Sequence, residues 1–354
     1  MSDAQVPATK VTIRHVASDA GVSVAAVSKV LRNAYGVSDG LREKVQQSIK
    51  KLNYRPSTAA RGMRGHTFSV GMLLIEMQNP FLPSIVAGAK DALQEAGYKT
   101  LIGVGEADAS IERSLVDSMI DLQMDGLILV APRLTGRQLS RYAAQRPMVV
   151  IGHHEADATA FDTVNCDDVA GARMAVDSLI VRGLRDIEMI SLSAAGQDHE
   201  VCALRERGYR AAMTAAGLEG KIRIRYVRDH PYDTGTDIAA ILKEDRLPEA
   251  FFCWSDIHAI ALLNHAYQLG VDVPGRLSVV GYDNTPTAGL PLIGLSSIEQ
   301  HGADLGRIAA TSLLSRLGGR TQAEHRLVTP DLVERRSSLR RPGPQAGNGL
   351  AQVP

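Results

Sequence analysis

Apolar and polar positions follow two different patterns along this chain, and the change falls near residue 66. From Thr12 to Asn33 the sequence TIRHVASDAGVSVAAVSKVLRN repeats apolar residues at helical spacing and is interrupted once, at Gly21. A second helical stripe follows Ser38, a residue type that favours the first position of a helix. The pattern predicts three short helices in the first 56 residues, the second of them beginning at Ser23.

After His66 the pattern changes to apolar runs that alternate with amphipathic stretches. The apolar runs include VGMLLIE (70–76), TLIGVGE (100–106), GLILVA (126–131), MVVIG (148–152), IEMISL (187–192), AFFCW (250–254) and LSVVGYD (277–283). Such runs separated by helices are typical of parallel sheets covered on both faces. Their number favours two doubly wound parallel sheets over one, so an α/β body with a small molecule at the carboxyl ends of the strands is predicted.

The distribution of charge along the chain indicates that its first segment binds a polyanion. The 354 residues include 39 Lys and Arg and 39 Asp and Glu, so the whole chain has no net charge. Residues 1–66 hold eleven basic and four acidic residues, however, which gives this segment a charge of +7 and the remainder −7. Three short helices with this charge favour a helix-turn-helix head that binds DNA over an ordinary helical bundle with solvated lysines.

Several other classes of protein are disfavoured. No apolar run approaches the ~18–20 residues of a membrane helix, and the start MSDAQVPATK lacks the apolar core of a secretion signal, so a cytoplasmic protein is expected. Cys166, Cys202 and Cys253 stand far apart and are predicted to be small buried hydrophobes.

Neither a metal nor a dinucleotide cofactor is predicted. The nearest approach to a dinucleotide fingerprint, Gly103-Val104-Gly105, lacks its third glycine because Asp108 stands there. His153 and His154 are adjacent with no acidic partner at ligand spacing, so a loop at a strand end is favoured over a metal site. No catalytic constellation can be recognised, and the chain is not expected to be an enzyme.

The head carries a specific motif. The pattern A-x-x-A-G-V-S-x-x-x-V-S-[RK]-V-L-x-N runs from Ala17 to Asn33, and L-x-Y-x-P runs from Leu52 to Pro56. In these motifs, and from Thr12 to about Glu334 as a whole, the chain resembles the lactose-repressor (LacI/GalR) family of bacterial transcription regulators.

The resemblance implies a domain organisation. It places a helix-turn-helix DNA-binding domain at 1–56, a hinge helix or linker at 57–66, an effector-binding and dimerisation domain at 67–336, and a flexible tail at 337–354. The effector-binding domain is expected to be two-lobed and periplasmic-binding-protein-like, with lobe N at 67–167 and 299–327 and lobe C at 168–298 and 328–336. The chain would cross between the lobes near residues 167, 298 and 328.

The resemblance also implies residues that contact DNA. The base-reading positions fall on Val24, Ala25 and Lys29, and the phosphate contacts on Thr12, Ser23, Ser28, Ser38 and Tyr54, with Arg32 as an added phosphate contact where the family usually has Asn. Lys29 replaces the usual Arg, so a point charge stands in place of a bidentate fork. Val24 and Ala25 offer apolar surface that suits a thymine methyl group.

The segment 57–66, STAARGMRGH, leaves two interpretations open. Its glycines, Gly62 and Gly65, each cost a helix roughly 0.8–1 kcal/mol relative to alanine, so the segment is either a flexible linker or a stretch that folds on binding. The resemblance implies a hinge helix that enters the minor groove, with contacts at Ala60 and Met63. Met63 would be the wedge between base pairs, where the family usually has Leu.

In the body, the resemblance implies eight effector contacts. They fall on Phe81, Leu82, Arg205, His230, Ser255, Asp256, Asp283 and Gln300. Arg205 would hold ligand hydroxyls or a carboxylate and Asp283 would accept from hydroxyls, although the two could instead form a structural salt bridge across the cleft. Two carboxylates and an arginine suit a sugar or a sugar acid, and His230 and Ser255 depart from the family pattern in a way that leaves room for an acidic effector.

The sequence therefore predicts a ligand-responsive, sequence-specific repressor of carbohydrate or sugar-acid metabolism genes, without a cofactor. It would bind near-palindromic double-stranded operator DNA as a homodimer, because the segment after Glu334 offers no leucine heptad for a tetramer. The alternative is a soluble sugar-binding receptor or sugar-processing enzyme with a basic N-terminal arm. The missing export signal and the missing catalytic constellation disfavour it.

Overall fold

The computed structural model describes residues 11–31, 34–55, 66–192, 200–228 and 231–339. It divides into two compact units, a head and a body, with the boundary between Thr67 and Phe68. The predicted contacts Arg32, Ala60, Met63 and His230 lie outside the described residues.

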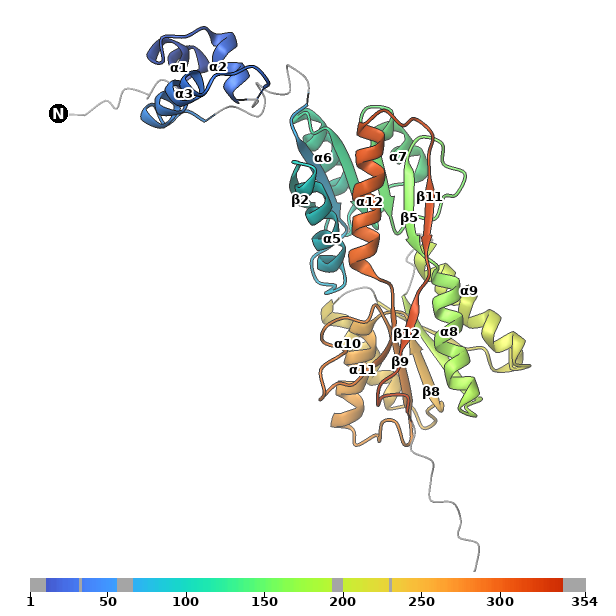
Figure 1. The fold of residues 1–354 in the computed structure, drawn as a ribbon. Coiled ribbons are helices and arrows are strands. Elements are labelled where there is room, and N and C mark those ends of the chain that lie inside the picture. The colour runs from blue at the N-terminus through green and yellow to red at the C-terminus, as the bar shows by residue number, and fades with distance from the viewer. Residues whose placement is uncertain (1–10, 32–33, 56–65, 193–199, 229–230, 340–354) are drawn as a thin grey trace, which may run out of the picture. The chain divides into compact units, whose positions relative to one another are not determined.

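The head consists of the three predicted helices (Figure 1). They are α1 (Ile13–Asp19), α2 (Val24–Leu31) and α3 (Asp39–Lys51). The hydroxyl of Ser23 accepts from the backbone N–H of Ala26 at 3.1 Å, and that of Ser38 accepts from Leu41 at 3.4 Å, so both predicted caps are confirmed. Gly21 has a φ of +64° in the turn between α1 and α2, a conformation that glycine adopts at little cost.

A small core holds the three helices of the head together. Val16, Val27 and Val45 come from different helices and are fully buried. The hydroxyl of Ser48 donates to the carbonyl of Val16 at 3.2 Å and ties α3 to α1. Each buried valine contributes on the order of 1.5–3 kcal/mol, so a few side chains account for most of the stability of the head.

The first sheet of the body has the strand order β11-β5-β4-β3-β1-β2, and every pairing within it is parallel. Its strands are β1 (Ser69–Leu74), β2 (Lys99–Val104), β3 (Gly126–Val130), β4 (Met148–Ile151), β5 (Asp162–Cys166) and β11 (His325–Val328). Helices α5 (Leu82–Glu95) and α12 (Gly302–Leu317) pack on one face, and α6 (Ala109–Asp121) and α7 (Gly136–Ala143) pack on the other. Side chains along β1 alternate between these two apolar cores, as the pleat of a strand requires.

The second sheet has the strand order β12-β10-β9-β8-β6-β7. Its strands are β6 (Ile187–Leu192), β7 (Ile224–Val227), β8 (Ala250–Cys253), β9 (Ser278–Tyr282), β10 (Ser296–Glu299) and β12 (Asp331–Val333). Helices α8 (Asp168–Val181) and α9 (Glu200–Ala215) cover one face, and α10 (Pro231–Leu242) and α11 (Asp256–Gln268) cover the other, while a short 3-10 helix, Glu219–Lys221, precedes β7. The prediction of two doubly wound sheets is confirmed, but the second is not wholly parallel because β12 runs antiparallel to β10.

Each of the seven predicted apolar runs coincides with a strand, although β1 and β2 each begin one residue earlier than the run. The chain passes between the two sheets three times: from β5 to α8, from β10 to α12, and from β11 to β12 (Figure 1). These connections bring residues from both sheets to the space between the lobes. None of the helices in the described ranges is long and apolar enough to cross a membrane.

The body extends further along the chain than expected. Residues 337 and 338 were predicted to lie in a flexible tail, but Ser337 and Ser338 are each only 1 % exposed. The hydroxyl of Ser337 donates to the carbonyl of Val279 in β9, and its backbone carbonyl accepts from the N–H of the same residue. The predicted boundary at 336 is therefore too early, because these serines satisfy backbone groups at the margin of the second sheet. The remainder of the predicted tail, 340–354, lies outside the described residues.

Candidate DNA-binding helix and effector cavity

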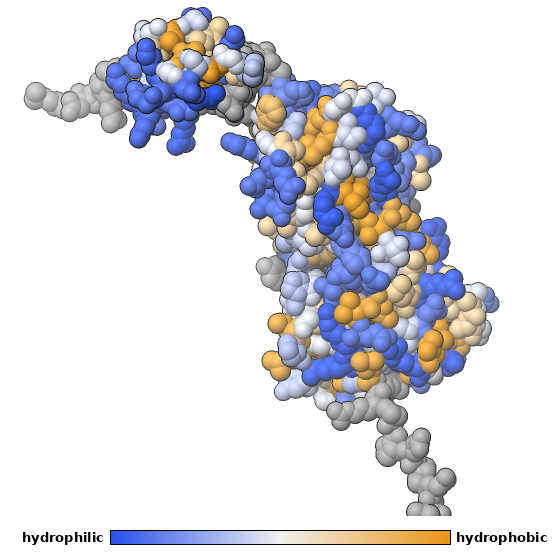
Figure 2. All heavy atoms as spheres, viewed as in Figure 1, coloured by the Kyte–Doolittle hydropathy of each residue, from blue (hydrophilic) through white to orange (hydrophobic). Residues whose placement is uncertain are grey.

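Helix α2 presents some of its predicted base-reading residues to solvent. Ala25 and Lys29 are exposed, whereas Val24 is half-buried and packs against the core of the head. A thymine methyl group would therefore meet Ala25 more readily than Val24, whose side chain also serves the packing. Figure 2 shows polar side chains gathered on one side of the head.

The predicted phosphate contacts fall into two groups. Thr12, Ser23 and Ser38 are exposed at the starts of the three helices, where backbone N–H groups favour an anion. Ser28 and Tyr54 are half-buried, and the ring of Tyr54 packs against the core of the head. Tyr54 thus has a structural contact in addition to its predicted contact with DNA.

A cavity of about 1450 Å³ lies between the two sheets of the body. It is lined by loops that follow strands of both sheets and by the N-terminal ends of α5 and α11. Six of the predicted effector contacts line it: Phe81, Leu82, Arg205, Ser255, Asp283 and Gln300. This location agrees with the rule that ligands bind at the carboxyl ends of parallel strands.

Arg205, on α9, is 3 % exposed and has a partner that the sequence did not reveal. Its Nε donates to Oδ1 of Asp168 at 2.8 Å, whereas its Nη1 lies 3.8 Å from Oδ1 of Asp283. Nη1 also donates to the backbone carbonyl of Trp254, and the guanidinium carbon lies 3.6 Å from the centre of the Tyr282 ring. A salt bridge between Arg205 and Asp283 was the structural alternative, and the stronger ion pair is the one with Asp168.

Asp168 lies at the start of α8, and its carboxylate contacts one side chain from each lobe, Arg205 and His154. Its Oδ2 lies 3.0 Å from Nε2 of His154, which follows β4 in the first sheet. Burial by itself would raise the pKa of Asp168, but Arg205 and His154 hold that pKa below its ordinary value. Burial by itself would lower the pKa of Arg205, but the neighbouring carboxylates raise that pKa above its ordinary value. The pair is therefore ionised at neutral pH.

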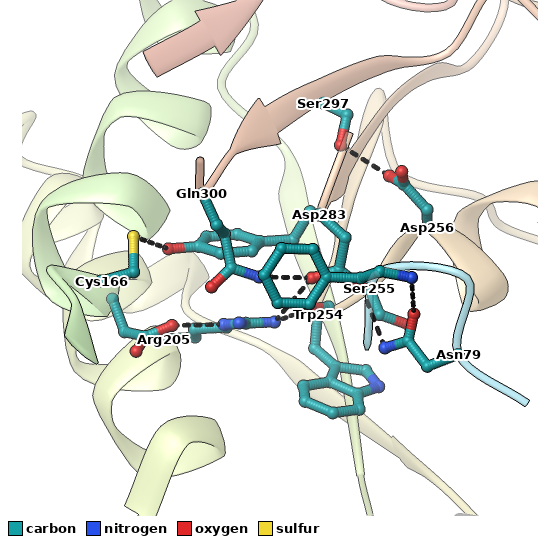
Figure 3. A network of polar contacts seen from close by, with 12 residues as sticks. Asn79, Cys166, Arg205, Trp254, Ser255, Asp256, Asp283, Ser297 and Gln300 are labelled. Atoms are coloured by element: carbon teal, nitrogen blue, oxygen red, sulfur yellow. Dashed lines mark hydrogen bonds and ion pairs between the residues drawn. The ribbon is translucent and has the colours of Figure 1, made fainter. Parts of the chain in front are cut away.

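Asp283 follows β9 and receives hydrogen bonds from both lobes (Figure 3). The amide of Gln300 donates to Oδ1 at 2.6 Å, and the amide of Asn79 donates to Oδ2 at 3.3 Å. Asn79 also accepts from the backbone N–H of Phe81 at 2.9 Å, which fixes the loop before α5. Burial raises the pKa of Asp283, and its φ of +108° is a strained conformation for a residue other than glycine.

Asp256 does not lie on the cavity wall, although it was predicted to contact the effector. Its Oδ2 accepts from the backbone N–H and the hydroxyl of Thr285, and its Oδ1 accepts from Ser297 at 2.6 Å (Figure 3). The side chain is fully buried, and burial raises its pKa. The geometry gives Asp256 a structural role, in which it ties the start of α11 to the strand ends beside it.

Three residues of this site escaped the sequence reasoning. Asp168 stands in an ordinary helix start, and only its position after a buried strand signals a role. Trp254 directly follows β8 and is the single tryptophan of the chain, and His258 lies in the first turn of α11. Both line the cavity.

The two adjacent histidines lie in a loop after β4, as predicted, and each contacts an acidic side chain. Nε2 of His153 lies 2.8 Å from Glu155, and His154 contacts Asp168 as described above. Among the described residues, no group of three His, Cys, Asp or Glu side chains is arranged to hold a metal ion. All three cysteines are buried and unbridged, as predicted, and burial raises the pKa of Cys166 to about 12.

Comparison with known families matches both parts of the chain. The model for bacterial regulatory proteins of the lacI family matches residues 12–57, and the model for a periplasmic binding protein-like domain matches residues 176–338. The fold and the cavity thus define a class of protein in which a helix-turn-helix head is joined to a ligand-binding body.

Relatives of nearly full length narrow the class. The chain is 31 % identical to the ribose operon repressor of Escherichia coli (strain K12) over 334 residues, which cover 92 % of this chain and 99 % of the relative. It is 28 % identical to catabolite control protein A of Priestia megaterium, over 93 % of this chain and 99 % of that protein. The lac repressor dimer bound to operator has the same fold, with a TM-score of 0.80 at 22 % identity over 94 % of this chain and 100 % of the other.

The chain therefore belongs to the lacI family of bacterial regulatory proteins. It is a DNA-binding transcriptional regulator and not an enzyme.

Proposed function

We propose that this protein is a cytoplasmic repressor that binds near-palindromic operator DNA as a homodimer and is controlled by a sugar or sugar acid in the cavity between its lobes. The observation that carries the proposal is the set of buried ionisable groups in that cavity. Arg205, Asp168 and Asp283 are each at least 95 % buried, and they meet where strands of both sheets end.

These groups suit an oxygen-rich ligand. Nη2 of Arg205 donates to no described residue, so two of its five N–H groups remain for oxygen atoms of a bound molecule. Each oxygen of Asp283 accepts one hydrogen bond and keeps a lone pair for a ligand hydroxyl. Phe81 offers a ring against which a sugar face can stack.

The names of the relatives point in the same direction. One relative is the ribose operon repressor, and one solved structure with 27 % identity and a TM-score of 0.67 is a complex of the regulator CelR with cellobiose, over 92 % of this chain and 99 % of the other. In the proposed mechanism the effector favours one arrangement of the lobes, and that arrangement changes how the two heads reach DNA. Such control requires the effector to bind the two arrangements with different affinity.

The experiment begins with selection of a preferred duplex from random DNA by the purified full-length chain. Binding of that duplex is then measured by fluorescence anisotropy with and without D-ribose, D-gluconate and cellobiose. The proposal expects a steep fall of log K with log[salt] and a change of at least fivefold in operator affinity with one of the sugars. A flat salt dependence and no enriched sequence would instead favour a sugar-binding receptor with a basic arm.

Two variants separate the functions of the head and the body. Lys29→Ala is expected to weaken operator binding, whereas Lys90→Ala removes an exposed lysine from α5 in the body and serves as its matched control. Gln300→Ala removes a donor to Asp283 and is expected to weaken the response to the sugar. An undiminished response in Gln300→Ala would contradict the placement of the effector in this cavity.

A further inference from the structure

Glu112 is a fully buried carboxylate behind the wall of the effector cavity. It lies on α6, is 0 % exposed, and does not itself line the cavity. The backbone N–H of Arg133 donates to both of its oxygens, to Oε2 at 2.8 Å and to Oε1 at 3.1 Å. Acidic side chains are almost never fully buried unless such donors compensate, so this contact ties α6 to the segment that follows β3.

Two segments of the cavity wall meet at this carboxylate. Residues 131–135, after β3, and residues 106–107, after β2, all line the cavity. Glu112 accepts from the first segment and packs against the backbone that leads into the second. A Cβ on Gly105 would lie 2.5 Å from Cγ of Glu112, so a glycine is needed there for the carboxylate to fit.

Both segments contain strained backbone. Glu106, Ala107 and Ala131 have φ values of +51°, +53° and +50°, a left-handed conformation that residues other than glycine rarely adopt. Such residues persist only where the surrounding structure fixes them, and they are concentrated at binding sites. Glu112 lies between the two strained segments and provides part of that support.

We propose that Glu112 is a positioning residue for the effector: its carboxylate holds residues 131–135 and 106–107 in the arrangement that the effector contacts, without touching the effector itself. This inference rests on the proposed function, because it requires a small molecule in the cavity. It also makes the wall sensitive to the protonation state of Glu112. An ionised carboxylate accepts at both oxygens, whereas a protonated one carries a hydrogen on one of them and holds the backbone less firmly.

Glu112 changes its protonation state near neutral pH. Burial raises its pKa to about 7, although the backbone N–H groups of Arg133 and Leu134 and the charge of Arg133 oppose that shift. Strands β1 and β3 carry no titratable side chain. The charged side chains on the other elements beside Glu112 are Asp108, Arg133, Glu106 and Lys99, the last at the far end of β2.

The direction of the pH effect follows from this geometry. If the ionised carboxylate holds the wall in the arrangement that the effector contacts, the effector binds the ionised form more tightly. Binding then favours release of the proton, so the Kd for the effector falls as the pH rises through about 7.

Three variants isolate the carboxylate. Glu112→Gln keeps one acceptor oxygen and resembles the neutral acid, whereas Glu112→Met has a similar length and no strong acceptor. Asp121→Asn removes an exposed acid at the end of the same helix and serves as the matched control. Circular dichroism and thermal unfolding establish that each variant is folded, and Glu112→Gln alone decides the test if Glu112→Met is not.

Hydrogen exchange tests the positioning without any effector. Mass spectrometry of the full-length chain should show that amides of residues 131–135 exchange at least tenfold faster in Glu112→Met, and measurably faster in Glu112→Gln, than in the unaltered chain and Asp121→Asn. Amides of β9, in the second lobe, should be unchanged. Equal rates at 131–135 in all four chains would overturn the inference whatever ligand the protein binds.

The pH profile of binding separates positioning from a merely structural role. D-ribose, D-gluconate and cellobiose are the probes, and emission of Trp254 in the cavity finds the one that binds. The ratio of its Kd in Glu112→Gln to that in the unaltered chain, measured by calorimetry, should be near one at pH 6 and at least five at pH 8. Other groups that titrate in this range act on both chains and cancel in the ratio. Asp121→Asn should give a ratio of one at both pH values, and a ratio for Glu112→Gln that does not change with pH refutes the role.

The two proposals fail in different ways. If no probe alters Trp254 emission or operator affinity, the proposed sugar response fails, and hydrogen exchange alone decides the inference about Glu112. If a probe binds and changes operator affinity but the ratio for Glu112→Gln is the same at pH 6 and pH 8, the proposed function stands and the role of Glu112 is wrong.

Discussion

Substituting Asn for Asp168 removes the charge that faces Arg205 and leaves the size of the side chain almost unchanged. The two groups form a buried ion pair of the effector cavity, with side chains 3 % and 4 % exposed and a distance of 2.8 Å. The substitution therefore tests whether this pair organises the cavity. A result near zero would mean that water or Asp283 replaces the lost carboxylate.

The expected magnitude follows from the geometry. At an effective dielectric constant of about 20, two unit charges at this distance attract by roughly 6 kcal/mol, and desolvation of both groups cancels most of that energy. Removing one partner of a buried pair costs about 3–5 kcal/mol because the other charge stays buried and unpaired. Asp283, 3.8 Å from the guanidinium, compensates in part, so a loss of about 3 kcal/mol is expected.

The assay is equilibrium unfolding in urea, followed by the emission of Trp254. As the single tryptophan it reports on the body and not on the head. Asp168→Asn and Arg205→Met are expected to cost about 3 kcal/mol each, and the double variant at least 2 kcal/mol less than the sum of the two. Additive losses would refute the claim that the two groups act as a pair.

A matched control lies on the same helix. Arg173 and Asp177 form an ion pair of 3.3 Å on α8, but both side chains are about half exposed. Exposed pairs of this kind contribute about 0.3–0.5 kcal/mol, so Asp177→Asn should leave the unfolding free energy almost unchanged. Equal losses in Asp168→Asn and Asp177→Asn would show that burial does not set the strength of the buried pair.

Three other predictions concern pH, DNA recognition and assembly. Burial raises the pKa of Glu112 from 4.5 to about 7. The free energy of unfolding therefore falls as the pH rises through that range, because the unfolded chain releases a proton that the folded chain keeps. Relative to Glu112→Gln, the unaltered chain should lose about 3 kcal/mol between pH 4.5 and pH 8 in urea unfolding. Lys29→Ala and Val24→Thr should each change the sequence that the chain selects from random duplexes, with a larger change for exposed Lys29 than for half-buried Val24. Sedimentation of the full-length chain should give a dimer, because no leucine heptad follows Glu334. A tetramer would contradict this prediction.

The hydropathy pattern predicted the apolar strands and missed β5, whose buried polar side chains form ion pairs and hydrogen bonds. Strand β5, with the sequence DTVNC, is buried at all five positions but contains Asp162 and Asn165. Asp162 accepts from Arg316 and Arg320, and Asn165 bonds the backbone of residues 152 and 153. A hydropathy pattern cannot detect such a strand, because the partners of Asp162 come from α12 and the segment that follows it, about 150 residues away.

The effector site was predictable to a similar extent. Arg205 and Asp283 were placed from motif positions, and both line the cavity. The sequence could not predict that Asp256 is structural and that Asp168 lines the cavity, because each acid follows a strand, β8 or β5, and begins a helix. Only the three-dimensional structure reveals that Ser297 and Thr285 donate hydrogen bonds to Asp256, whereas Arg205 and His154 contact Asp168.

The packing of α5 against α12 links the cavity to the rest of the first lobe. A Cβ on Gly88 would lie 1.9 Å from the carbonyl oxygen of Ala303, and a Cβ on Gly306 would lie 2.0 Å from that of Ile85, so the two helices are in close backbone contact and cannot slide past each other.

Both helices begin beside Asp283, a residue of the second lobe. The loop before α5 reaches Asp283 through Asn79, and the segment before α12 reaches it through Gln300. A ligand hydroxyl that donates to a free lone pair of Asp283 therefore acts beside the hydrogen bonds that tie both helices to the second lobe. Because the helix pair is rigid, a shift in these bonds moves the first lobe against the second as a body. An effector that binds one of the two positions more tightly then shifts the population of the dimer that binds DNA.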